Sequence, residues 1–186
     1  MTIRELRLIG DPILRTPSDP ATRFDDALGR LVDDLLENVL LPGRAGLAAP
    51  QIGVSLAAFS YHVDGRHGYV INPVIAQTEG EYDGPEACLS VPGVTACTVR
   101  AMRTVVTGVD RHGDPVIVEG TEEMSRCLLH ETDHLRGVLF LDRLSGQERK
   151  DALRQLRRNA GRGAGARFGD RGDDDHRARR SVRLRP

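Results

Sequence analysis

The stretch Cys127-Leu-Leu-His130-Glu131-Thr-Asp-His134 contains the pattern His-Glu-x-x-His. Residues four apart on an α-helix lie on one face, so His130 and His134 can hold a single metal ion from the same side. Glu131 lies one step round the helix, where its carboxylate can reach a water bound to that metal. Metal-dependent hydrolases use this spacing, because two imidazoles fix the ion and a carboxylate moves the proton. A solvated helix that carries two histidines by chance is the alternative.

The chain as a whole has the size and composition of one globular domain. Its 186 residues suffice for a substantial core, and its net charge of -1 argues against a nucleic-acid-binding protein. No apolar run is long enough to span a bilayer, and the first residues lack the apolar core of a signal peptide. Three cysteines, an odd number, fit reduced thiols better than a disulfide scaffold. We therefore expect a cytoplasmic protein that is not associated with a membrane.

Apolar residues at helical spacing predict helices over residues 22–40, 121–137 and 145–160. Thr22 is the predicted N-cap of the first helix, and its apolar stripe is predicted to run from Phe24 to Leu40. Runs of apolar and β-branched residues predict short strands at 56–61, 69–71, 74–77, 104–109 and 116–119. The small-residue run 43–53, taken alone, favours a flexible connector, in which Gln51 is the one side chain able to donate hydrogen bonds.

From Gly161 onward the composition changes to Gly, Arg and Asp without apolar periodicity. We therefore divide the chain into one domain over residues 1–160 and a tail over residues 161–186 that is predicted to be disordered. A solvated tail is favoured by this composition, and contact between its arginines and the ribosome or a nucleic acid is the alternative.

A catalytic zinc-type site usually has three protein ligands and a water, so a third ligand is needed. Cys127 shares the helical face but lies seven residues before His134, about 10.5 Å along the axis, which is too far to share one ion. Asp142 follows the helix closely and is also placed to cap a turn, and Cys97 lies in a strand-like run. Cys88, on a segment bracketed by Pro and Gly, is the best remaining candidate.

Three separated stretches resemble, in order and spacing, the motifs of the peptide deformylase family: Gly46-Leu-Ala-Ala-Pro-Gln51, Glu86-Ala-Cys-Leu-Ser90 and His130-Glu-Thr-Asp-His134. The segments 10–15 and 135–142 are also similar to the family, so the resemblance covers residues 3–160. It implies an α+β fold in which mixed or antiparallel β-sheets pack around a central metal-binding helix. It also implies a hydrolase that removes the N-formyl group from the formylmethionine of new polypeptides, with one divalent metal ion. That ion is typically Fe2+, and zinc, nickel or cobalt can replace it.

The resemblance also implies a role for individual residues. Cys88, His130 and His134 would bind the metal, and Glu131 would act as general base and acid. The Gln51 side chain and the backbone N–H of Leu89 would stabilise the oxyanion. Substrate contacts would come from Gly46 and from residues around the pocket for the first side chain, namely Arg44, Ala45, Glu86, Arg126 and Cys127.

The chain departs from the family pattern at Arg44, Ala45, Ala87, Arg126 and Leu129. None of these changes removes a catalytic atom, so they bear on substrate range and rate. Burying an unpaired guanidinium is costly. We therefore expect Arg44 or Arg126 to pair with Glu86, which leaves the pocket apolar and methionine preferred. An arginine head that points into the pocket, and so favours a polar or acidic first residue, is the alternative.

Three other functions stay open at the level of the sequence. A zinc endopeptidase would need a further ligand downstream of His134, such as Asp142 or Glu148. A divergent deformylase paralogue would have an altered substrate or weak activity. A non-catalytic metal-binding or ribosome-associated protein would use the arginine-rich tail as its working part.

Overall fold

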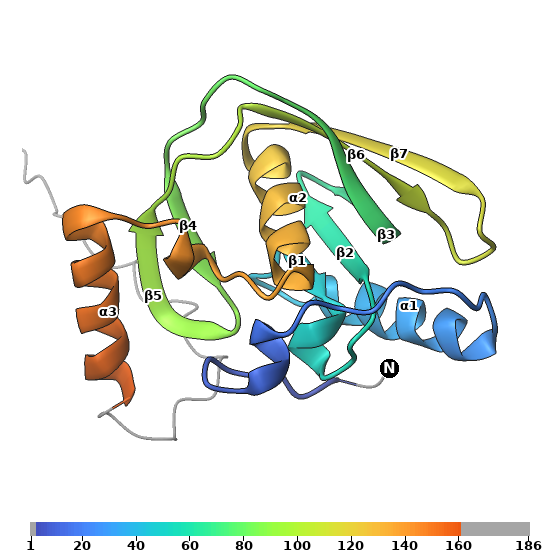
Figure 1. The fold of residues 1–186 in the computed structure, drawn as a ribbon, viewed down its shortest axis with the longest axis horizontal. Helices are drawn as coiled ribbons and strands as arrows, with labels where there is room; N and C mark the ends of the chain where they lie inside the picture. Colours follow the sequence, from blue (N-terminus) through green and yellow to red (C-terminus); the bar gives the residue numbers. More distant parts are fainter. Residues whose placement is uncertain (1–2, 161–186) are drawn as a thin grey trace, which may run out of the picture.

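A five-stranded antiparallel sheet and a separate two-stranded hairpin flank the helix that carries the His-Glu-x-x-His pattern in this computed structural model (Figure 1). The structure describes residues 3–160, so the predicted tail 161–186 lies outside the described residues. The sheet has the order β1-β2-β3-β6-β7, with β1 Gly46–Ala48, β2 Ala58–Val63, β3 Arg66–Glu79, β6 Arg103–Val109 and β7 Pro115–Thr121. The hairpin consists of β4 (Pro85–Cys88) and β5 (Val91–Cys97). This is the α+β class that the resemblance implied.

The helix α2 (Glu122–Leu135) is the buried centre of the molecule. Eleven of its fourteen residues are buried, which excludes a solvated helix that carries two histidines by chance. One face packs on the sheet through Met124, Cys127, Leu128 and Leu135. The opposite face looks toward the hairpin (Figure 1), and His130 and His134 lie on it, since they contact Glu86 and Cys88 of β4. Glu122 and Glu123 lie in the first turn, where a negative charge suits the helix dipole.

The helix α1 (Asp26–Val39) covers the other face of the sheet. Successive strand residues point to opposite faces, so Leu47 and Ile71 contact α1 while their neighbours Ala48 and Val70 pack on the α2 side. The predicted start of α1 was wrong. Its N-cap is Asp25, whose carboxylate accepts from the backbone of the first turn, whereas Thr22 and Phe24 precede the helix. Phe24 and Leu40, predicted at the ends of the stripe, are exposed.

Two segments differ from the sequence-based expectation. The predicted strands 69–71 and 74–77 are parts of one long strand, β3, whose register shifts between Ile71 and Val74. Asn72 has a positive φ of 50° there, and its side chain bonds both backbone groups of Ala21. The expected flexible connector at 43–53 is wrong as well. Most of it is the strand β1 and the short 3-10 helix η2 (Ala49–Ile52), and both are entirely buried.

The hairpin rests on the C-terminal part of the described chain. The helix α3 (Gly146–Ala160) packs along β5, as Figure 1 shows. A third apolar cluster joins Cys88 and Val91 of the hairpin to Phe140 and Ala152. Two further 3-10 helices, η1 (Pro12–Arg15) and η3 (Phe140–Asp142), complete the described elements. Within residues 3–160, the helices are all too short or too polar to cross a membrane.

Candidate metal centre

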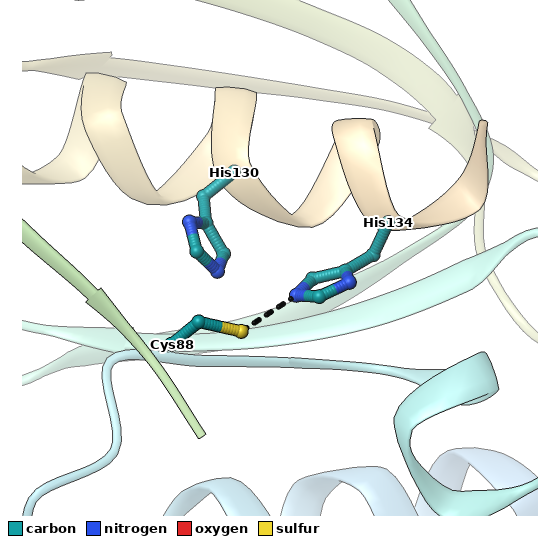
Figure 2. Close-up of side chains that lie close together, drawn as sticks. All are labelled: Cys88, His130 and His134. Atoms are coloured by element: carbon teal, nitrogen blue, oxygen red, sulfur yellow. Dashed lines mark hydrogen bonds between the residues drawn. The ribbon is translucent and has the colours of Figure 1, made fainter. Parts of the chain in front are cut away.

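Cys88, His130 and His134 each bring one ligand-type atom to the same place, and these atoms lie within 4.8 Å of one another. The two imidazoles project from successive turns of α2 toward the Cys88 side chain at the end of β4 (Figure 2). Sγ of Cys88 is 3.2 Å from Nε2 of His134, and all three residues are buried. A thiolate and two imidazoles form a donor set that suits zinc and several other transition metals.

The second nitrogen of His130 is held by a carboxylate. Nδ1 of His130 lies 2.6 Å from Oε1 of Glu86, which leaves Nε2 for the site. Such a carboxylate fixes the tautomer and the ring plane of a metal-binding histidine. At His134, burial lowers the pKa well below its ordinary value, so this imidazole is neutral, the form in which histidine binds metals. The residues present therefore fit a divalent metal ion.

A buried ion network supports this arrangement. Arg100 donates to both carboxylate oxygens of Glu86, at 2.9 and 2.6 Å, and its third donor reaches Asp133 at 2.7 Å. Nε of Arg143 donates to Asp133 as well, at 3.0 Å. Burial alone would raise the pKa of Glu86, but hydrogen bonds from Arg100 and His130 outweigh it and lower the pKa to about 2. Glu86 is therefore a carboxylate that joins the hairpin to α2.

The carboxyl group of Glu131 is buried and is not fully hydrogen-bonded within the described chain. Within the described residues, its Oε2 has no hydrogen-bond partner, and burial raises its pKa to about 7 in spite of the neighbouring His130. Gly46 lies directly beside it: a Cβ built on Gly46 would be 2.2 Å from Oε1 of Glu131. A buried, unpaired carboxyl group with a pKa near neutrality suits a general acid and base.

The side chain of Gln51 closes the site from η2. Its Oε1 accepts from the backbone N–H of Ala48 at 2.8 Å. Its amide nitrogen therefore lies on the other side, 3.2 Å from Oγ of Ser90 and 3.8 Å from Sγ of Cys88. Leu89 follows Cys88 in the turn of the hairpin and lines the same cavity.

The cavity at the site has a volume of about 400 Å³. It lies between β1, the hairpin and α2, and its lining includes Gln51, Cys88, Leu89, His130 and Glu131. Five of the residues assigned to the substrate also line it, namely Gly46, Ala45, Glu86, Arg126 and Cys127. Arg44 is not among the described residues that line it. Its guanidinium donates to the backbone carbonyl of Asn38 at 3.1 Å, at the end of α1.

Arg126 is buried, and its main partners are not those expected. Nη1 donates to the carbonyls of Gly84 and Thr98, at 2.8 and 3.3 Å, and the guanidinium lies 4.8 Å from the centre of the Tyr82 ring. Its distance to Glu86 is 3.8 Å, so the expected ion pair is present only as a long contact. The guanidinium is thus anchored to the base of the hairpin.

The other candidate ligands lie elsewhere. Cys127 donates to the carbonyl of Ala45, and Cys97 is exposed at the end of β5. Asp142 accepts from the backbone N–H of Leu139 at 2.9 Å and pairs with Arg15. It is not part of the Cys-His-His group in the described chain, so the structure gives no support to an endopeptidase site built on it.

Comparison with known proteins decides the family. A family model described as polypeptide deformylase matches residues 3–150. The chain belongs to the peptide deformylase family. A peptide deformylase of Acidothermus cellulolyticus is 50% identical over 157 residues, covering 84% of this chain and 87% of the relative. One of Parafrankia sp. is 49% identical over 159 residues, with the same coverage of 84% and 87%.

Solved deformylase structures have the same fold. The crystal structure of the peptide deformylase from Thermus thermophilus superposes with a TM-score of 0.79 at 38% identity, covering 86% of this chain and 96% of that one. The enzyme from Legionella pneumophila gives a TM-score of 0.79 at 37% identity, with coverage of 87% and 99%. These findings confirm the resemblance, the α+β fold and the deformylase class of hydrolase.

Two residues of this deformylase site had no signal in the sequence. Arg100 lies in no motif, and its partners Glu86 and Asp133 are 14 and 33 residues away along the chain. Asp133 is part of the His-Glu-x-x-His stretch, but its type and position are equally those of a solvated helical residue. Arg126 was the expected partner of Glu86 because both lie in or beside a family motif, whereas Arg100 lies in none.

Proposed function

We propose that the chain hydrolyses the N-formyl group of formylmethionyl peptides, with Cys88, His130 and His134 as the complete set of protein ligands for one divalent metal ion. The convergence of these three ligand atoms beside the unpaired carboxyl of Glu131 is the observation that carries the proposal. A metal ion bound there supplies Lewis-acid activation of water and of the formyl oxygen.

Glu131 is proposed to move the proton in this reaction. It accepts a proton from the attacking water and later returns it to the departing amine. Burial raises its pKa above the ordinary value of a glutamate, and a pKa closer to the working pH suits a group that must both accept and return a proton. Gly46 leaves room for this carboxyl group, since any side chain at that position would meet it.

Gln51 and Leu89 are proposed to stabilise the developing oxyanion. The amide nitrogen of Gln51 faces the Cys88 end of the site, and Leu89 lines the cavity next to Cys88. Hydrogen-bond donors that are fixed before the reaction are worth most in a site closed to water. Gln51 lies on η2 and Leu89 in the turn of the hairpin, and both line the cavity.

Methionine is proposed as the preferred first side chain. Apolar lining comes from Ala45, Leu89, Val91 and Val94, and Cys127 contributes a thiol that is already bonded to a carbonyl. One nitrogen of the Arg126 guanidinium, Nη1, donates to the carbonyls of Gly84 and Thr98 at the base of the hairpin. An unbranched apolar side chain therefore fits this cavity better than an acidic one.

The donor set suits Fe2+, Zn2+, Ni2+ and Co2+, and Fe2+ is proposed from the family resemblance. Metal analysis of protein purified without oxygen, combined with anomalous diffraction at the metal edge, tests the ion and its ligands. A side chain of Cys127 or Asp142 in contact with the ion, or no contact from Cys88, would contradict the ligand set.

Residues 1–160 are proposed to form the whole catalytic domain, acting in the cytoplasm. The tail 161–186 is proposed to be dispensable for the chemistry, with ribosome contact as its candidate role. A chain that ends after Ala160 should melt and turn over like the full chain, and a fall of several degrees in melting temperature would contradict this.

Release of formate from formyl-Met-Ala-Ser tests the proposed activity. The assay uses iron-loaded protein without oxygen, because Fe2+ and its thiolate ligand are sensitive to oxidation. Wild type should release formate, and the Glu131→Gln variant should release it much more slowly. The absence of formate from iron-loaded wild type would contradict the proposal, and weak release would favour a divergent paralogue.

A further inference from the structure

The carboxamide of Gln51 is held in a single orientation by its surroundings. Gln51 is 1% exposed, so solvent does not compete for its hydrogen bonds. The backbone N–H of Ala48 points at one end of the amide at 2.8 Å, and only the oxygen can accept from it. The nitrogen must therefore occupy the other end, which faces the hairpin.

The hydroxyl of Ser90 contacts that nitrogen. Oγ of Ser90 lies 3.2 Å from Nε2 of Gln51, and Ser90 is fully buried. A carboxamide nitrogen has two N–H groups at fixed angles in one plane. When one of them donates to Ser90, the direction of the other is set, and the nearest feature on that side is Sγ of Cys88 at 3.8 Å.

We propose that Ser90 is a positioning residue, which holds the Gln51 amide so that one N–H is aimed at the formyl oxygen during hydrolysis. The inference rests on the proposed deformylase function and on Gln51 as an oxyanion donor. Without the hydroxyl, the amide would keep its bond to Ala48 and the long contact with Sγ of Cys88, and it would be less firmly held. The second N–H would then point at the oxyanion for a smaller part of the time.

Backbone hydrogen bonds also hold Gln51 and Ser90 close to each other. Arg7 N–H donates to the carbonyl of Gln51, and Ile9 N–H donates to the carbonyl of Ser90, both at 2.8 Å. Groups two residues apart in an extended segment point to the same side. The N-terminal arm therefore bridges η2 and the hairpin, and fixes the distance that the Gln51–Ser90 contact spans.

A purely structural serine is the competing interpretation. Ser90 would then only satisfy a buried amide, and its loss would lower stability without a specific effect on turnover. Ser125 offers a matched control, because it is also fully buried, bonds Thr104 and Ala101, and does not line the cavity. The comparison separates loss of a buried hydroxyl from loss of this particular contact.

Steady-state kinetics of Ser90→Ala, Gln51→Ala and the double variant test the proposal. One oxyanion donor is worth about 100- to 1,000-fold in kcat, so a misaimed donor should cost about 10- to 100-fold, with a small change in KM. Ser90→Ala should cost nothing further in the Gln51→Ala background. Ser125→Ala should lower the melting temperature to a similar extent but keep its kcat.

A second pair of variants keeps the test valid if Ser90→Ala does not fold. Ser90→Thr and Ser90→Val carry the same added methyl group and differ only in the hydroxyl. The Thr variant should keep most of its kcat, and the Val variant should lose it. In zinc-loaded, 15N-labelled protein, the side-chain amide resonances of Gln51 should shift in Ser90→Val and stay near their wild-type positions in Ser90→Thr.

The outcomes distinguish this inference from the function on which it rests. Wild type that releases no formate would overturn both. Active wild type with an unchanged kcat in Ser90→Ala and in Ser90→Val would overturn the positioning role alone. An equal loss of kcat in the wild-type and Gln51→Ala backgrounds would also overturn it, since Ser90 would then act independently of Gln51.

Discussion

Gly46 and Glu131 lie so close together that a Cβ atom on Gly46 would stand 2.2 Å from Oε1 of Glu131. No pair of non-bonded heavy atoms tolerates that distance, so a side chain at position 46 requires the carboxyl group or the strand β1 to move. Gly46 therefore contributes to the site because it has no side chain, and the Glu131 carboxyl occupies the space that a side chain would fill.

Gly46→Ala should lower kcat by about 100-fold or more, the scale of a displaced general acid and base. The control is Gly29→Ala in α1, where an added Cβ meets nothing within 4 Å. Alanine in a helix interior should stabilise the protein there by about 0.5–1 kcal/mol and leave turnover unchanged. Formate release and thermal melting of both variants check the prediction, which a fully active Gly46→Ala protein would refute.

Glu131→Gln should keep the fold and the bound metal and lose about two to four orders of magnitude in kcat. Glutamine has the same shape, but it cannot accept and return a proton. Metal content and kcat are measured on the same preparation, so that loss of metal is not mistaken for loss of the base. Near-normal turnover in the metal-loaded variant would show that Glu131 is structural.

Arg100→Met should destabilise the protein by about 3–5 kcal/mol, because it removes the buried cation that bridges two buried carboxylates, Glu86 and Asp133. Arg103→Met is the matched control. Its partners Glu79 and Glu119 are exposed, and exposed ion pairs contribute about 1 kcal/mol or less. Denaturant unfolding of both variants measures the difference, and equal losses would mean that burial of the Arg100 network adds nothing.

Arg126 and Arg44 should differ in their effect on selectivity. Arg126 lines the cavity, so Arg126→Ile should change the ratio of kcat/KM for formyl-Met and formyl-Glu peptides by several fold or more. Arg44→Gly should leave the ratio unchanged, since Arg44 bonds the end of α1 instead. Wild type should prefer formyl-Met. A strong preference for formyl-Glu in wild type would show that the Arg126 charge is available to the substrate.

Removal of the metal by a chelator should lower the melting temperature, because an ion that binds only the folded chain stabilises it by mass action. The Cys88→Ala variant should melt near the chelated wild type and change little when chelator is added. A Cys97→Ala variant, with an exposed cysteine outside the site, should behave like wild type. Identical melting of wild type with and without chelator would contradict the predicted site.

The sequence was sufficient to predict the helices and strands that are marked by patterns among neighbouring residues. The spacing of the apolar residues and of the two histidines was enough to predict α2. Runs of apolar and β-branched residues were enough to predict β6 and β7 on either side of their turn. The break predicted within β3 falls at Asn72 and Pro73, where the strand shifts register and the Asn72 side chain bonds Ala21. Small residues at 43–53 suggested flexibility, but in the fold they permit close packing beside Glu131.

The residues of the candidate site also differ in whether a short sequence motif marks them. Gln51, Cys88 and Glu131 lie in short motifs, so the family resemblance pointed to them, and in the structure all three line one cavity. Arg100 has no motif and depends on a tertiary contact between the hairpin and α2. Arg126 lies 3.8 Å from Glu86, as a long ion pair, and Arg100 holds both oxygens of that carboxylate at shorter distances.

The Cys88 and His134 side chains meet although their positions are 46 apart in the sequence. That interval contains β5, β6, β7 and most of α2, so the three donor atoms come together only when the hairpin has docked on the helix. A partly folded chain has the two histidines at most, and two donors bind an ion far more weakly than three. Tightly retained metal in a preparation therefore marks molecules in which the hairpin has docked on α2.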